Sequence, residues 1–126
     1  MARLWTIIAV NEVAAGLSWY QSLLGLPQTA PAHDHFGQVI DAGGTVLLCL
    51  HLWGAHEHPS LASPAVARPG NGLLLFFRVD DFDLALERAR DLVDRLDEQP
   101  HVNPNTGTKE FAVRDLDGYH VTISAI

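Results

Sequence analysis

Two side chains near the C-terminal end of the chain have the chemistry of a proton donor and acceptor. His120 and Glu110 lie in short segments that alternate apolar and polar residues, a pattern that predicts β-strands. Histidine is the natural general base near neutral pH, and a nearby carboxylate can assist it. The sequence therefore offers this pair as a candidate acid–base site. His120 could instead only shape a pocket, and Glu110 could be a rim carboxylate paired with Arg78 or Arg114.

The chain has seven histidines, and two groups of them have spacings that can bind a metal ion. Neither group matches a closed zinc signature, and there is no His-Glu-x-x-His segment. His33, His35, His56 and His58 are interpreted as solvated loop histidines, with a relocated or loop-borne metal site as the alternative, whereas His101 is expected at the surface of a strand edge. The two groups are His33 with His35, and His51 with His56, Glu57 and His58.

Residues 109–123 are the most informative segment of the chain. Phe111 and Val113 alternate with polar residues, a tight turn follows at Asp117, and Val121 and Ile123 alternate again, which predicts a β-hairpin. An Arg-Asp-x-Asp-Gly turn before an alternating strand resembles the closing hairpin of the vicinal oxygen chelate superfamily. That superfamily contains glyoxalase I, extradiol dioxygenases, fosfomycin-resistance enzymes and bleomycin-resistance proteins.

The order of predicted elements repeats once along the chain, and this repeat extends the resemblance to nearly the whole sequence. The expected α+β fold has two tandem βαβββ modules that form a cupped mixed sheet, as in the glyoxalase and bleomycin-resistance proteins. A ferredoxin-like α+β domain is the alternative. We expect one domain, residues 1–126, with modules at 1–54 and 72–126 and a linker at 55–71. Strands are expected at residues 4–10, 36–41, 45–53, 73–79, near 101–102, 109–115 and 119–125, and helices at 12–24 and 82–96, the second capped by Asp80 or Asp81.

The resemblance implies a metal centre, but this chain lacks the residues for it. Metal-using members place one ligand on each of four strands, commonly histidine or glutamate. The corresponding positions are Trp5, Leu74 and Thr122, with a fourth near residues 48–50. Tryptophan and leucine cannot ligate a divalent ion, and threonine is a poor ligand beside carboxylate or imidazole. We therefore expect no metal at these positions and no cofactor, with a relocated divalent metal as the alternative.

Strand alternation predicts which side chains face the concave side of the cup. Trp5 from the first strand, Leu74 and Phe76 from the strand that opens the second module, and Thr122 from the last strand should face inward. We predict that these four residues bind substrate or ligand, because aromatic and apolar walls suit flat organic molecules. Simple filling of a cup without a metal is the alternative. His120 should line the same cavity, close to Glu110.

The composition of the chain limits the kinds of partner and compartment that we expect for it. The chain has 15 acidic and 8 basic residues and a formal net charge of −7, so a nucleic acid is not an expected partner. No apolar run approaches the about 20 residues of a membrane span, and no signal peptide is recognisable. The single cysteine, Cys49, permits no internal disulfide and is interpreted as a small buried hydrophobe, which fits the cytoplasm.

These observations leave two function classes open. The first is a small-molecule-binding protein of the bleomycin-resistance type, in which acidity and aromatic residues hold a cationic compound. The second is an enzyme of the superfamily, a lyase, isomerase or dioxygenase-like protein, that uses His120 and Glu110 or a relocated metal. In either case the resemblance implies a homodimer. The sequence does not identify the ligand.

Overall fold

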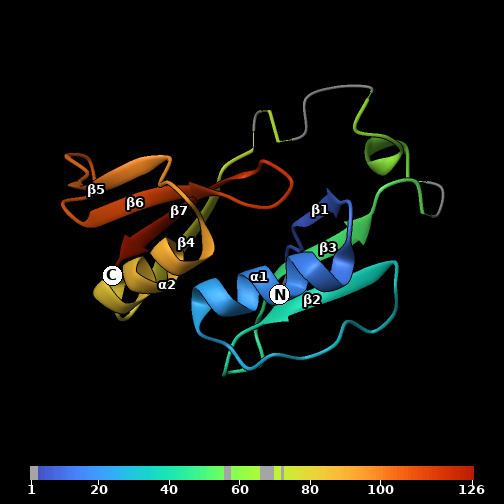
Figure 1. Cartoon of the computed structure of the whole chain (residues 1–126), viewed down its shortest axis with the longest axis horizontal. Helices are drawn as coiled ribbons and strands as arrows, with labels where there is room; N and C mark the ends of the chain where they lie inside the picture. The colour runs from blue at the N-terminus through green and yellow to red at the C-terminus, as the bar shows by residue number, and fades with distance from the viewer. Residues whose placement is uncertain (1–2, 56–57, 66–69, 72) are drawn as a thin grey trace. The chain divides into compact units, whose positions relative to one another are not determined.

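The computed structural model describes residues 3–55, 58–65, 70–71 and 73–126. The chain divides into two compact units, Met1–Gln21 with Leu26–Pro69 and Ser22–Gly25 with Gly70–Ile126. Each unit contains one helix and one mixed sheet, so the fold consists of two βαβββ-like modules as predicted (Figure 1). Among the described residues no helix is long and apolar enough to span a membrane.

The first unit is a three-stranded sheet with one helix. It contains β1 (Ile7–Val10), α1 (Val13–Leu24) as far as Gln21, β2 (Phe36–Ile40) and β3 (Val46–Leu52), in the sheet order β1-β3-β2. β1 runs parallel to β3, and α1 makes the long return connection that parallel strands require. Close packing of this helix needs two glycines, because an added Cβ would lie 3.2 Å from Leu50 at Gly16 and 3.0 Å from Val13 at Gly37.

The second unit is a four-stranded sheet with one helix. It contains β4 (Leu75–Val79), α2 (Phe82–Leu92), β5 (Glu98–Val102), β6 (Lys109–Arg114) and β7 (His120–Ala125), in the order β4-β7-β6-β5. β4 is parallel to β7, and the other pairs are antiparallel. Asp81 caps α2, since its Oδ1 accepts a hydrogen bond of 3.1 Å from Leu84 N, which stabilises the first turn.

Several element boundaries differ from the sequence predictions. α2 ends at Leu92 and not at Leu96, because Val93 is already extended, with φ −125° and ψ 151°. Leu96 is nevertheless buried, so its apolar spacing reflects a real core position that an extended chain reaches. β5 begins at Glu98 and is longer than the short strand predicted near 101–102. In the first unit the opening strand starts at Ile7, and the linker region contains a 3-10 turn, Pro59–Leu61.

The two faces of the second sheet differ in what covers them. One face packs on α2, where the ring of Phe111 lies 5.5 Å from the ring of Phe82. Cross-strand pairing puts Ile123 opposite Phe111, and Val121 opposite Val113, on the same helix-covered face. All four of these strand side chains are fully buried. The sequence prediction that Val121 and Ile123 pack towards the helix agrees with this burial.

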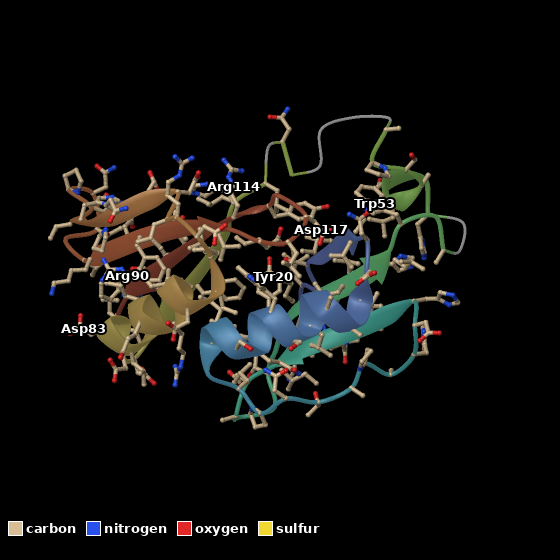
Figure 2. The ribbon with its side chains drawn as sticks, in the orientation of Figure 1. Tyr20, Trp53, Asp83, Arg90, Arg114 and Asp117 are labelled. Atoms are coloured by element: carbon tan, nitrogen blue, oxygen red, sulfur yellow. The ribbon has the colours of Figure 1, made fainter. Side chains whose placement is uncertain are left out.

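The β6–β7 connection holds the hairpin register. Asp115 Oδ1 accepts hydrogen bonds of 2.9 Å from Asp117 N and 2.8 Å from Tyr119 N. Gly118 has φ +90°, a left-handed conformation that favours glycine. Arg114 NH1 donates to the carbonyl oxygen of Gly118 at 3.1 Å. Figure 2 shows Arg114 and Asp117 at this end of the hairpin. The turn chemistry therefore fixes which residues of β6 and β7 lie opposite each other.

Candidate functional site

The face of the second sheet opposite α2, called the polar face below, collects most of the predicted site residues. Its rows follow from strand register, because paired residues point to the same side of a sheet. In the central row Phe76 of β4 pairs with Thr122 of β7, and Thr122 pairs with Ala112 of β6. The rows on either side of this central row carry charged residues, and they form two separate clusters.

The first cluster surrounds His120. Its Nδ1 lies 2.9 Å from Asp97 Oδ2, and its Nε2 lies 3.7 Å from Glu98 Oε2. Arg114, which pairs with His120 across the hairpin, places Nε 3.3 Å from the same Asp97 oxygen. The His120 side chain is 23% exposed and that of Glu98 is 49% exposed. The cluster is therefore half-buried on the Asp97 side and open to solvent on the Glu98 side.

An irregularity in β5 brings the acidic residues onto the polar face. Glu98 pairs with Ala112 and His101 pairs with Glu110, with a register shift between them. Residues three apart in a regular strand point to opposite faces, so this β-bulge is what turns both side chains to the same side. Asp97 is held just before the strand, where its N–H donates to the carbonyl oxygen of Ala112 at 2.8 Å.

The second cluster surrounds Glu110 at the other end of the polar face. Asn103 Nδ2 donates to both carboxylate oxygens of Glu110 at 3.2 Å, and His101 Nε2 lies 3.5 Å from Oε1. Ser124, opposite Glu110 in β7, is buried and lies 3.2 Å from the hydroxyl of Thr108. Glu110 itself is only 8% exposed. This carboxylate is saturated by neighbours that come from β5 and from the turn after it.

The predicted closeness of His120 and Glu110 is wrong. Glu110 pairs with Ser124, whereas His120 pairs with Arg114. The two candidates therefore stand four residues apart along the hairpin, about 13 Å at the usual rise per residue. Both occupy the polar face, as alternation predicted, but each has its own partners. Counting strand pairs outward from the Asp-x-Asp-Gly turn predicts this separation of His120 and Glu110.

The four residues predicted to bind ligand fall in both units. Leu74 and Phe76 are 55% and 43% exposed, and Thr122 is buried between its strand neighbours. Leu74 directly precedes Leu75, whose partner is Val121, so Leu74 lies beside His120 in the next row. Trp5 belongs to the first unit, is 54% exposed, and lines a pocket of about 630 Å³ together with Arg3 and residues 43–46.

The residues present do not suit the metal centre that the resemblance implies. Trp5 and Leu74 have no ligating atom, and Thr122 offers one neutral hydroxyl. Within residues 3–55, 58–65, 70–71 and 73–126, no three histidine, cysteine, aspartate or glutamate side chains form a group that could hold a metal ion. His56 and Glu57 of the second histidine group lie outside the described residues.

The histidines of the first unit form two ring pairs. The rings of His33 and His35 lie 5.8 Å apart, and those of His51 and His58 lie 5.1 Å apart. Buried Cys49 lies on the same face of the first sheet as His51, and Gln38 Nε2 is 3.7 Å from its sulfur. Burial raises the pKa of the Cys49 thiol, which the hydrogen bond from Gln38 opposes. A neutral buried thiol is a poor nucleophile, in agreement with its predicted role as a small hydrophobe.

Sequence reasoning missed three residues of the two clusters. Asp97 and Glu98 follow the predicted helix, and Asn103 lies in the turn after β5. Edge strand β5 is exposed along its whole length, so it has no apolar alternation to reveal it. The available signal was Val93, a β-branched residue at the end of a charged helix, followed by Pro100, which favours extended chain before it.

Comparisons with known proteins agree with this architecture. A family model described as the Glyoxalase/Bleomycin resistance protein/Dioxygenase superfamily matches residues 3–123. A search of curated proteins found no match in sequence. A glyoxalase/bleomycin resistance protein from Catenulispora acidiphila DSM 44928 has 22% identity and a TM-score of 0.65, and the match covers 100% of this chain and 99% of that one.

Two further solved structures have the same fold. An enzyme of the glyoxalase/bleomycin resistance protein/dioxygenase family from Burkholderia phytofirmans PsJN has 19% identity and a TM-score of 0.73, with 97% of this chain and 96% of that one covered. A lactoylglutathione lyase from Agrobacterium tumefaciens has 20% identity and a TM-score of 0.67, with 98% and 92% covered. At these identities the likeness concerns the fold.

Proposed function

Because the chain belongs to the Glyoxalase/Bleomycin resistance protein/Dioxygenase superfamily, we propose that it binds a small organic molecule on the polar face of its second sheet. In this proposal binding does not use the family's metal centre. Both modules act as one domain, residues 1–126. Leu74, Phe76 and Thr122 of the second module are the proposed ligand-binding residues of this face, and Trp5 is proposed as a ligand-binding residue of the first module.

One observation carries the proposal. Leu74 and Phe76 are 55% and 43% exposed on a face that also carries the charged and polar side chains of the two clusters. Large apolar side chains that gather among polar neighbours mark binding surfaces, and an aromatic ring supplies contact area at low entropic cost. Leu74, which belongs to this patch, and Thr122, which pairs with Phe76, stand at two of the positions where metal-using relatives carry ligands. The side chains there suit an organic body better than an ion.

The charge of the chain favours a cationic ligand. The formal net charge is −7, and the cluster around His120 has two carboxylates, Asp97 and Glu98, beside one guanidinium group, Arg114. A net negative field raises the local concentration of positively charged small molecules. A compound with an apolar ring system and a positive group would therefore gain from both features of this face.

An enzyme of the same superfamily is the second candidate, and the 2.9 Å contact between His120 and Asp97 favours it. A carboxylate at Nδ1 orients an imidazole and leaves Nε2 available as a base. In such a lyase, isomerase or dioxygenase-like protein, His120 would move a proton on the bound molecule with Asp97 in the partner role that the sequence suggested for Glu110. Glu110 would then support the sheet.

We also propose a cytoplasmic homodimer. Exposed apolar side chains on strands at the sheet edges, such as Ile7 in β1 and Val102 in β5, would be covered by pairing with a second chain. The single cysteine fits a reducing compartment. Light scattering at tens of micromolar should give the dimer mass, and a monomer mass would contradict this part of the proposal.

A thermal-shift screen of chelator-stripped protein tests the binding proposal. A ligand at about 100 times its dissociation constant adds roughly 2.7 kcal/mol to the free energy of unfolding, which is readily measured. Hits should lose affinity in Phe76→Ala and keep it in Leu116→Ala, a control that removes a more exposed apolar side chain, at 60%, from the β6–β7 turn. Ligands that stabilise Phe76→Ala as well as the parent would contradict the site.

A further inference from the structure

We propose that Nε2 of His120 and Oε2 of Glu98 together bind a positively charged N–H group of the ligand, with Asp97 as the positioning residue that makes His120 an acceptor. This inference rests on the proposed binding function and specifies what the polar face recognises. The ligand class is an organic molecule with an apolar, preferably flat body and an amidinium or ammonium group at one end.

Asp97 fixes the tautomer of His120. Asp97 Oδ2 lies 2.9 Å from Nδ1, and an ionised carboxylate can only accept hydrogen bonds. Nδ1 must therefore carry a hydrogen and donate it. In the neutral imidazole the other nitrogen, Nε2, is then an acceptor with its lone pair directed away from Asp97. A histidine without this carboxylate would populate both tautomers.

Nε2 of His120 and Oε2 of Glu98 lie near each other without forming a hydrogen bond. The two acceptor atoms are 3.7 Å apart, which is beyond hydrogen-bond distance, so the neutral imidazole and the carboxylate do not satisfy each other. Two acceptors at this separation can each take one hydrogen from the same charged nitrogen group. Charge-assisted hydrogen bonds of this type are shorter and stronger than neutral ones, and they need a donor that the ligand supplies.

The cluster around His120 carries an excess negative charge while His120 is neutral. Arg114 Nε lies 3.3 Å from Asp97 Oδ2, and its NH1 donates to the Gly118 carbonyl oxygen. Arg114 and Asp97 thus neutralise each other next to the hairpin turn. Within the described part of the chain, the ion-pair contact of Glu98 is with His120. While His120 is neutral, Glu98 therefore leaves the cluster with an excess negative charge that faces solvent.

The aromatic ring of Phe76 provides apolar surface near the two acceptors. Glu98 pairs with Ala112, Ala112 with Thr122, and Thr122 with Phe76. Ala112 and Thr122 in the middle of this row are buried, whereas Glu98 and Phe76 at its ends are exposed. His120 lies two residues from Thr122 in β7, so a ligand whose charged end is at Nε2 and Glu98 places its flat body against Phe76. Glu110 is the less accessible carboxylate, because it is 8% exposed and Asn103 donates to both of its oxygens.

Three probes of the same shape and different charge test this recognition. Benzamidine, benzamide and benzoate share one phenyl ring and differ in the head group, which is positive, neutral or negative. Ligand-observed NMR at pH 8, where histidine side chains are ordinarily neutral, gives the dissociation constant of each. The parent protein should bind benzamidine at least about tenfold more tightly than benzamide, and benzoate most weakly.

Variants separate recognition from general stability, because the ratio of the two dissociation constants is measured on the same folded protein. Glu98→Gln and His120→Phe should bring the benzamidine preference close to one. Asp97→Asn should lower it by removing control of the tautomer, and Asp97→Glu should restore part of it. Glu110→Gln, a carboxylate change at the other end of the same face, is the matched control and should keep the full preference.

The outcomes distinguish this inference from the proposed function. Equal affinity for benzamidine and benzamide, no benzamidine binding at millimolar concentration, or an unchanged preference in Glu98→Gln would overturn the charged-nitrogen site. Phe76→Ala should weaken both benzamidine and benzamide and leave their ratio unchanged. Screened ligands that bind independently of Phe76 would instead contradict the binding site as a whole, whatever their charge.

Discussion

The two faces of the second sheet are built by the same four strands and show opposite properties. On the helix-covered face Phe111, Val113, Val121 and Ile123 are fully buried, and the ring of Phe111 packs on Phe82 of α2. On the polar face the neighbouring residues of those strands include exposed Phe76 and half-buried His120. Successive residues of a strand point to opposite faces, so one is expected to contribute to stability and the next to ligand recognition.

The polar face itself contains a second contrast. The cluster at Glu110 is closed, with each carboxylate oxygen held by Asn103. The cluster at His120 is open, and its two outward acceptors, Nε2 and the Glu98 carboxylate, do not satisfy each other. Saturated polar groups stabilise a structure, whereas available ones can bind a ligand. The following substitutions test both contrasts, beginning with the largest expected loss of stability.

Phe111→Ala against Phe76→Ala compares the two faces directly. Phe111 is fully buried against α2, so its truncation should cost about 3–5 kcal/mol of unfolding free energy. Phe76 is 43% exposed, and its truncation should change stability by about 0.5 kcal/mol or less. Urea unfolding followed by circular dichroism measures both. Equal losses would show that the polar face is a core surface and not a binding surface.

Val121→Ala tests the helix-covered face within the last strand. Val121 has no exposed surface and pairs with Val113 and Leu75. Removing its two methyl groups should lower the unfolding free energy by on the order of 1–3 kcal/mol. Ligand affinity, measured where the variant is still folded, should stay at the parent value. A loss of affinity without a loss of stability would reverse the assignment of faces in β7.

Glu110→Gln tests the closed cluster. The substitution keeps the shape but replaces a charged acceptor by an amide, so one hydrogen bond with Asn103 is lost or reversed. We expect a destabilisation of about 1 kcal/mol and no change in ligand affinity. Thermal unfolding and a ligand titration on the same preparation check the two parts. Loss of binding with unchanged stability would favour Glu110 as a functional carboxylate.

His120→Ala tests the open cluster and should change stability little. The side chain lies on a partly exposed face, and exposed ion pairs such as His120 with Glu98 contribute about 0–1 kcal/mol. The fold should therefore remain, while ligand binding or turnover is lost. Circular dichroism verifies the fold, and titration of any screened ligand measures the effect. A variant that binds as well as the parent would reduce His120 to a lining residue.

Much of the fold could be predicted because its signals are local. Alternation and the Asp-x-Asp-Gly turn fixed the hairpin of β6 and β7 within one residue at its ends. Asp81 caps α2, and Gly25, with φ +67°, ends α1 as a left-handed residue should. These features depend on neighbours in sequence, and the alternation of faces follows directly from them.

The site was harder to predict, because it depends on register and on an irregular edge strand. His120 and Glu110 appeared close only while the pairing across the hairpin was not counted residue by residue. Asp97 and Glu98 reach His120 because α2 stops early and β5 contains a bulge. Neither feature leaves a periodic signal, since Leu96 is the one apolar residue in the segment from Asp94 to Gln99. Tertiary pairing with β6 therefore determined what local propensity did not.

The most direct test of the central claim, metal-independent binding of a small molecule on the polar face, is chemical-shift mapping. Protein labelled with ¹⁵N and stripped with a chelator is titrated with the tightest compound from the screen. The account predicts saturable shifts that centre on Phe76, Ala112, Thr122 and His120, with binding unchanged when a divalent ion is added. Binding that appears only after a divalent ion is added, or shifts confined to the helix-covered face, would contradict it.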